Sequence, residues 1–117
     1  MSANDRKLIE LAAKAAGISV KYNTHWSGFE RQDMADEFGR GVVWNPLNND
    51  GDAFRLMVSL GIEVNRVNCM QKTICFYSRH GAIIQFDEQS NCDPCASTRR
   101  AIVRAAAASG EQLEGNE

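Results

Sequence analysis

Hydrophobic residues recur at helical spacing most densely in the middle of the chain, at residues 50–60. Asn49 or Asp50 would cap the start of this helix, and Gly61 would end it. Apolar residues fall on two adjoining sides, namely Phe54, Met57 and Val58 on one and Ala53, Leu56 and Leu60 on the other. A helix that is apolar around most of its circumference is expected to be buried. The pattern therefore predicts that this helix is the centre of the fold.

The same local pattern occurs near the start of the sequence. Ser2 or Asn4 would cap a helix that ends at Gly17, and a strand would follow at residues 18–26. The buried stripe of this helix is predicted to contain Leu8, Leu11, Ala12 and Ala15. The stretches LAAKAAGISV and LMVSLGIEV thus share one local arrangement: the end of a helix, a glycine cap, an apolar contact and a strand. We interpret this as shared capping physics rather than as a duplication.

The remaining segments differ in how clearly they predict a structure. Residues 29–39 fit either a short helix or an acidic loop, and residues 42–44 fit a short strand ahead of a turn at Asn45 and Pro46. Alternating residues then predict three strands, at 64–70, 73–79 and 82–87. Their short connections favour an antiparallel meander.

The last helix is predicted to start at Asp93 and Pro94 and to reach about residue 108. Gly110, two residues later, would stop it. The predicted order is α-β-(α)-β-α-β-β-β-α, with the bracketed helix as the alternative to a loop at 29–39. This order predicts an α+β fold, a single domain at residues 1–110 with helices packed on a mainly antiparallel sheet. Residues 111–117 would be an acidic, frayed tail.

Composition narrows the functional classes. The chain has 117 residues, 44% hydrophobic and 24% charged, and its formal net charge is −2. This balance is typical of a globular protein with one core, and it gives no general attraction to nucleic acid or membranes. No stretch reaches the roughly 20 apolar residues that span a bilayer, and the first residues predict an amphipathic helix rather than a signal peptide. We expect a cytoplasmic protein with reduced cysteines.

Four cysteines, Cys69, Cys75, Cys92 and Cys95, form the most suggestive set for a metal site. Cys92 and Cys95 have the spacing of a zinc knuckle, but Cys69 and Cys75 are a poor second pair because five residues separate them on a predicted hairpin. A redox reading of the same CxxC stretch would require a βαβ context, and here a meander precedes it. We therefore predict no metal and no cofactor.

No catalytic residue is predicted, and the protein is not expected to be an enzyme. His25 and His80 have no nucleophile at a recognisable spacing. Residues 48–52 resemble part of a calcium loop, but Pro46 and Met57 would occupy its first and last ligand positions. Helix capping explains these polar residues.

Two sets of residues are candidates for binding a partner. The first combines aromatic and acidic side chains: Trp26, Phe29, Glu30, Asp33, Asp36 and Glu37. Aromatic residues are enriched at interface hot spots, and an acidic run would suit a basic partner, although such runs are usually only solvated. The second set is Arg99, Arg100 and Arg104 of the last helix, which would hold phosphate groups. These arginines could equally form a solvated face.

Three stretches resemble a known group of proteins: RKLIELAAKAAGI, VVWNPLNNDGDAFRLMVSLGIEV and CDPCASTRRAIVRAAA. They are similar to small proteins of tailed bacteriophages and prophages, which share an LAAKAAGI helix, a WNPL-x-DDGDA-x-RL segment and an ATRRAIVRAAA helix. That group has no assigned function. The resemblance therefore implies a phage or prophage origin and a setting in the host bacterial cytoplasm, and it implies no activity.

These observations favour a phage-encoded accessory protein that binds a host protein or protein complex stoichiometrically. A CRISPR-type antiviral defence complex is one candidate partner. The alternative is a nucleotide or nucleic-acid binding module that uses the arginine helix. No membrane contact is expected, and the sequence leaves the identity of the partner and the oligomeric state open.

Overall fold

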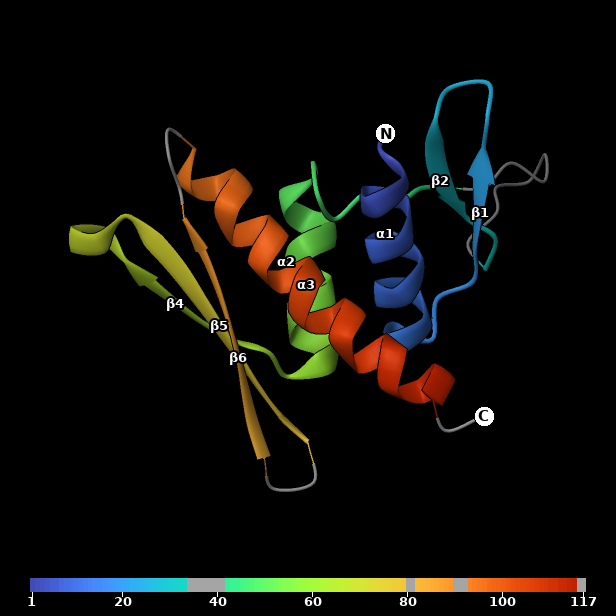
Figure 1. Cartoon of the computed structure of the whole chain (residues 1–117). Helices are drawn as coiled ribbons and strands as arrows, with labels where there is room; N and C mark the ends of the chain where they lie inside the picture. The colour runs from blue at the N-terminus through green and yellow to red at the C-terminus, as the bar shows by residue number, and fades with distance from the viewer. Residues whose placement is uncertain (34–41, 80–81, 90–92, 116–117) are drawn as a thin grey trace.

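Three helices lie between two antiparallel sheets in the computed structural model, which describes residues 1–33, 42–79, 82–89 and 93–115 (Figure 1). The helices are α1 (Ala3–Ala16), α2 (Asp50–Leu60) and α3 (Pro94–Gly115). One sheet contains β1 (Val20–Asn23), β2 (Gly28–Arg31) and β3 (Val42–Val43). The other contains β4 (Glu63–Val67), β5 (Lys72–Arg79) and β6 (Ala82–Gln89), with the short 3₁₀ helix η1 (Asn68–Met70) between β4 and β5. The α+β prediction is confirmed, but the strands form two sheets instead of one.

The caps of α1 and α2 are among the alternatives that the sequence predicts. Ser2 and Asn49 are the N-caps, and each accepts a hydrogen bond from a backbone N–H in the first turn. Gly17 and Gly61 end the helices with φ angles of 71° and 66°, which only glycine adopts without cost. An antiparallel meander of three strands follows each of these two helices. In the described residues, a helix followed by a three-stranded meander therefore occurs twice, and α3 comes last.

The buried side of α1 is rotated relative to the prediction. Ile9 and Ala13 are buried together with the predicted Leu11 and Ala12, whereas the predicted Leu8 and Ala15 are partly exposed. The helix packs along α3, and the cation of Arg6 also lies 3.7 Å from the centre of the Tyr22 ring in β1. A helix that meets neighbours on two sides needs a wider apolar face than a single stripe provides.

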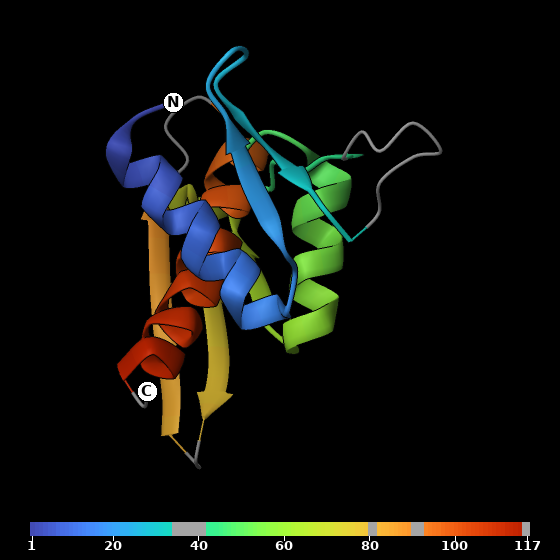
Figure 2. The same cartoon turned by 90° about the vertical axis from the view of Figure 1, so that its right-hand side faces the viewer.

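Residues 29–31 contradict the predicted short helix or acidic loop. They belong to β2, the central strand of the first sheet, which pairs with β1 from Val20 opposite Arg31 to Asn23 opposite Gly28 (Figure 2). The strand has only four residues, so it is too short to show a clear alternation in the sequence. Trp26, predicted to end the first strand, lies in the turn between β1 and β2. Residues 34–39 of the predicted segment lie outside the described residues.

The second sheet is the predicted meander. β4 pairs with β5, and β5 pairs with β6 in a register that runs from Lys72 opposite Gln89 to Arg79 opposite Ala82. Alternate residues of β5 are buried against α3, namely Thr73, Cys75 and Tyr77. The hydroxyl groups of Thr73 and Thr98 lie 2.8 Å apart, which fixes the sheet to the helix. β4, the first strand of this sheet, ends earlier than the strand predicted at residues 64–70, because η1 begins at Asn68.

The centre of the core is α3, and the prediction that α2 is the buried centre of the fold is wrong. The middle turns of α3 consist largely of buried residues, namely Ala101, Ile102, Val103, Ala105, Ala106 and Ala107. This helix contacts α1, α2, β5 and β6. In α2, Ala53 and Leu56 are buried, but Phe54 and Val58 are each 61% exposed. Small alanine side chains let neighbours approach α3 from several directions, whereas α2 packs on one side only.

Gly110 does not stop the last helix. Asp93 caps α3 as predicted, but the helix runs through Gly110 to Gly115. A Cβ atom on residue 110 would collide with the carbonyl oxygen of Leu11 and would lie 2.8 Å from its carbonyl carbon. Glycine at this position therefore lets the backbones of α1 and α3 touch. Residues 116–117 of the predicted tail lie outside the described residues.

Candidate functional site

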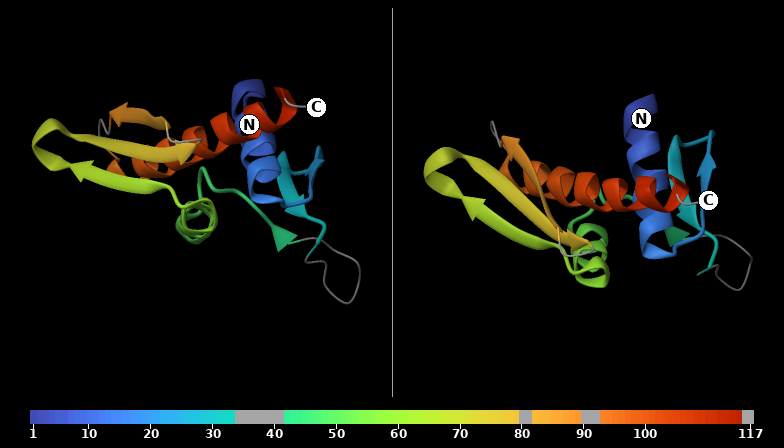
Figure 3. Two further views of the ribbon diagram at one scale, coloured as in Figure 1. Left: turned by 90° about the horizontal axis from the view of Figure 1, so that it is seen from below. Right: turned by 60° about the horizontal axis from the view of Figure 1, so that its bottom comes forward.

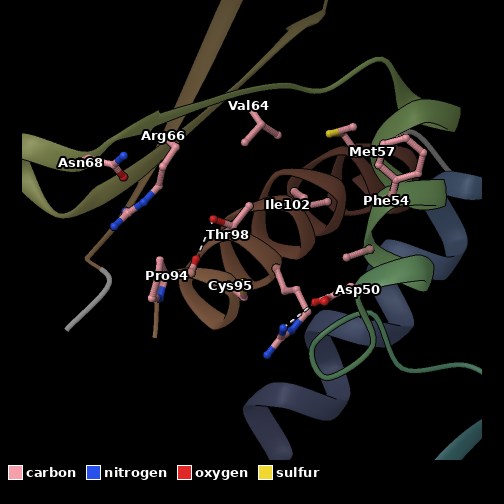
Figure 4. Close-up of a pocket in the computed structure, with 12 residues that line it drawn as sticks. Asp50, Phe54, Met57, Val64, Arg66, Asn68, Pro94, Cys95, Thr98 and Ile102 are labelled. Atoms are coloured by element: carbon pink, nitrogen blue, oxygen red, sulfur yellow. Dashed lines mark hydrogen bonds and ion pairs between the residues drawn. The ribbon is translucent and has the colours of Figure 1, made fainter. Parts of the chain in front are cut away.

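A groove of about 480 Å³ lies between α2 and β4, above the first turns of α3 (Figure 4). Most of the side chains that line it are apolar, including Phe54 and Met57 of α2, Val64 of β4, and Cys95 and Ile102 of α3. Its volume falls in the range of sites that bind small molecules and cofactors. The sequence did not group these residues as one site, although Cys95 was weighed as a metal ligand, because separate elements bring them together.

The groove exists because α2 and β4 diverge although they are consecutive in the chain. Gly61 reverses the backbone after α2, and Ile62, which is only 6% exposed, anchors the start of β4 in the core. From this point β4 runs away from α2, as Figure 3 shows. α2 packs on α3 instead. The two walls of the groove therefore meet at one end and open toward the other.

Phe54 stands on the α2 wall of the groove and is 61% exposed. Val58, one turn later on α2, is equally exposed. A single exposed apolar side chain needs no explanation, but an aromatic residue beside an apolar concave surface is typical of a binding site. Burial of a phenylalanine side chain contributes about 1.5–3 kcal/mol, so Phe54 offers a partner substantial binding energy.

Charged groups from α2, β4 and α3 also line the groove. The Nη1 atom of Arg99 lies 2.6 Å from the carboxylate of Asp50, and its Nε donates to the carbonyl oxygen of Leu47 at 2.8 Å. Arg66 enters from β4, and its Nη1 donates to the Thr73 hydroxyl at 3.5 Å. The described lining thus contains two arginines and one carboxylate, so its formal charge is positive.

The three arginines predicted to bind phosphate reach three different elements. Arg99 pairs with Asp50 at the start of α2, Arg100 pairs with Asp5 of α1 at 3.0 Å, and Arg104 pairs with Glu88 of β6 at 2.6 Å. A phosphate group would have to displace these carboxylates one by one. Phosphate binding by this set stays a prediction, and the observed ion pairs do not favour it.

The first predicted partner-binding set is only partly a surface. Trp26 is 44% exposed, and its Nε1 donates to the Glu30 carboxylate at 3.2 Å. Phe29, by contrast, is 2% exposed and packs edge to face against Tyr22, with 5.1 Å between ring centres. The assignment of Phe29 to a binding surface is wrong, because β2 turns this side chain into the core.

The acidic residues of that set are described only in part. Arg31 forms a bidentate pair with Asp33, with a shortest distance of 2.8 Å. This hydrogen bonding lowers the pKa of Asp33. Asp36 and Glu37 lie outside the described residues. Their role in binding stays a prediction.

The described cysteines do not lie together. Cys69 and Cys95 are exposed and Cys75 is buried, while Cys92 is outside the described residues. Within the described ranges, no three His, Cys, Asp or Glu residues are grouped as metal ligands. Cys95 lines the groove and Cys69 does not.

Burial raises the pKa of the Cys75 thiol from 9.0 to about 11. The folded state thus favours the neutral thiol, so this group's stabilising contribution is complete below pH 9 and is lost as the pH rises toward 11. We expect urea denaturation to show that the free energy of unfolding falls over this pH range, and that the fall is smaller in Cys75→Ala.

Below pH 9, iodoacetamide should modify Cys69 and Cys95 in the native protein, and Cys75 only after unfolding. Equal labelling of Cys75 and Cys95 would contradict this expectation.

Packing and polar contacts fix the turn that precedes α2, on one side of the groove. Trp44 is buried, the backbone N–H of Asn45 donates to Asp52 at 2.9 Å, and Asp52 also pairs with Arg55 at 2.8 Å. Arg99 of α3 donates to the Leu47 carbonyl oxygen and so ties α3 to the same turn.

Comparison with family models, with curated proteins and with solved structures finds no match to this chain. None of the helices in the described ranges is both long enough and apolar enough to cross a membrane. A function must therefore be argued from the groove itself.

Proposed function

We propose that this protein acts by binding another protein stoichiometrically, through the groove between α2 and β4. The observation that carries this proposal is the exposed Phe54 side chain on the wall of an apolar groove. Interface hot spots are enriched in aromatic residues that enter or border well-packed pockets. The arginine helix is the less favoured alternative, because its guanidinium groups are held by carboxylates of the same chain.

The resemblance to phage-encoded proteins suggests a setting for this activity. In that setting the partner is a host protein or complex, and occupation of its surface is the whole activity. A CRISPR-type antiviral defence complex is one such partner. This assignment is part of the proposal, and it is tested by the identity of the protein that the groove retains.

We predict that Phe54→Glu weakens partner binding by about tenfold or more, since loss of a hot-spot side chain costs about 2 kcal/mol. The unfolding free energy should change by less than about 0.5 kcal/mol, because the side chain is exposed and glutamate is a good helix former. Partners would be captured from host lysate, identified by mass spectrometry and purified. Isothermal titration calorimetry with each variant would then give affinity and stoichiometry.

Val42→Glu is the matched control, because Val42 is 45% exposed on β3 in the other sheet and is paired opposite Arg31. It should bind like the wild type. Retained binding by Phe54→Glu together with lost binding by Trp26→Ala would move the interface to the first sheet. Failure to capture any partner that titrates with the purified protein would reject the binding function.

A further inference from the structure

We propose, building on the protein-binding function, that the groove receives an extended segment of the partner, which adds to β4 as a fourth strand of the second sheet. The inward-facing residues of this segment follow an apolar-x-acidic pattern. The proposal rests on the exposed edge of β4, on the apolar walls of the groove and on the charge of its lining. Each of these features selects for a different property of the occupant.

The first feature is the edge of β4. This strand pairs with β5 from Glu63 opposite Phe76 to Val67 opposite Lys72, and no described strand lies on its other side. Backbone donors and acceptors along such an edge are a template for a further strand. Recognition by strand addition uses these groups for affinity and uses the alternate side chains for specificity.

The need to satisfy backbone groups distinguishes a strand from a helix as the occupant. A helix uses its own backbone donors and acceptors internally, except at its ends. A partner helix laid against β4 would therefore remove water from the strand edge without replacing its hydrogen bonds, and each buried unsatisfied group costs about 1–3 kcal/mol. An extended segment supplies the missing partners.

The second feature is the pleat of the sheet. Val64 and Arg66 are two residues apart on β4, and both side chains point into the groove (Figure 4). A strand paired with β4 would place alternate residues beside them. The residue beside Val64 would enter the apolar space bounded by Met57 and Ile102. The groove therefore selects an apolar side chain at that position.

The third feature is charge. The residue two positions along the added strand would face Arg66, on the β4 wall of a groove that Arg99 and Asp50 also line. The described lining has two arginines and one carboxylate, although the whole chain has a net charge of −2. A local positive lining in an acidic protein favours an acidic partner group and disfavours a basic one.

A peptide library tests the occupant without knowledge of the natural partner. Random peptides of about ten residues, enough to form one strand, would be displayed and selected on the wild-type protein, with removal of those that also bind Phe54→Glu. We expect the retained sequences to share an apolar-x-acidic pattern. If no sequence is retained, the inference is overturned, while capture of a partner from lysate still tests the proposed function independently.

Backbone chemistry then tests the mode of binding. One retained peptide would be synthesised with a single N-methyl group at each successive amide. Strand addition predicts that affinity falls by about tenfold or more at alternate positions only, since every second amide faces β4. It also predicts slower hydrogen exchange of β4 amides in the complex. Unprotected β4 amides, with a bound peptide that is helical by circular dichroism, would overturn strand addition and leave the binding function intact.

Charge reversal tests the acidic position. Arg66→Glu should reduce the affinity of the peptide about tenfold, and a peptide with lysine in place of the acidic residue should recover it. Lys21→Glu, on β1 of the other sheet, is the matched control and should bind like the wild type. A glutamate-to-glutamine change in the peptide gives the same information if Arg66→Glu folds poorly. Unchanged affinity in both experiments would overturn the charge assignment.

Discussion

Phe29→Ala is expected to lower the free energy of unfolding by about 3–5 kcal/mol, the cost of removing a large buried aromatic side chain. Phe29 is 2% exposed, lies on the central strand of the first sheet and packs against Tyr22. Small domains are stable by only about 5–15 kcal/mol, so this one change removes a large part of the total. Urea denaturation followed by tryptophan fluorescence measures the loss.

Trp26→Ala is the control for Phe29→Ala. The two residues are three positions apart, but Trp26 is 44% exposed and its one described hydrogen bond, to Glu30, is at the surface. Its removal should cost about 1 kcal/mol. Similar losses for the two variants would show that Phe29 is not a core residue. A binding defect in Phe29→Ala would report unfolding, and it would not place Phe29 in an interface.

Gly110→Ala should lower the free energy of unfolding by about 1–3 kcal/mol, the usual cost of forcing extra volume into a packed interior. The sign is the informative part, because glycine to alanine in an ordinary helix interior gains up to about 1 kcal/mol. Here the added methyl group would meet the backbone of Leu11, which cannot move without separating α1 from α3. Chemical denaturation of the purified variant gives the sign directly.

Gly51→Ala provides the comparison, because Gly51 also lies in a helix. A Cβ atom there would be 3.2 Å from the guanidinium group of Arg55 and 3.3 Å from the Oδ1 atom of Asn49, and both are ends of side chains that can shift by the small distance required. This variant should keep its stability within about 0.5 kcal/mol. If Gly110→Ala were the more stable of the two, the backbones of α1 and α3 could not be in contact.

Local sequence signals predicted the parts of the fold that depend on local physics. The Ser2 and Asn49 caps and the glycines at 17 and 61 act within one helical turn, so the residues themselves contain the information. The meander of the second sheet was predictable for the same reason, because alternation and short connections are both local. These features establish the α+β class.

The exposed side of α2 was predictable from the sequence. Arg55 and Ser59 lie one turn apart and mark the solvent side of the helix, and Phe54 and Val58 are their immediate neighbours. All four residues are exposed. The number of apolar residues around the circumference suggested burial, but the positions of the two polar residues indicate which side faces solvent. The number of apolar residues in a helix does not show which of its sides have neighbours.

The groove itself could not be predicted, because it results from the divergence of two consecutive elements over a third. Its walls come from segments near residues 54, 64 and 98, which nothing in the sequence connects. Arg99 shows the same limit. Its attraction to Asp50 and to the Leu47 carbonyl spans about half the chain, so a charge pattern alone could not distinguish a structural tie from a phosphate ligand.

The position of α3 also sets the order in which the molecule can be made. Both helix-and-meander units contribute residues to the one hydrophobic core that this helix completes, and it is encoded after all of them. During translation, the earlier segments therefore leave the ribosome without the surface that completes their core. The nascent chain should stay open to chaperones and proteases until residues 101–107 have emerged, and then fold in one cooperative step.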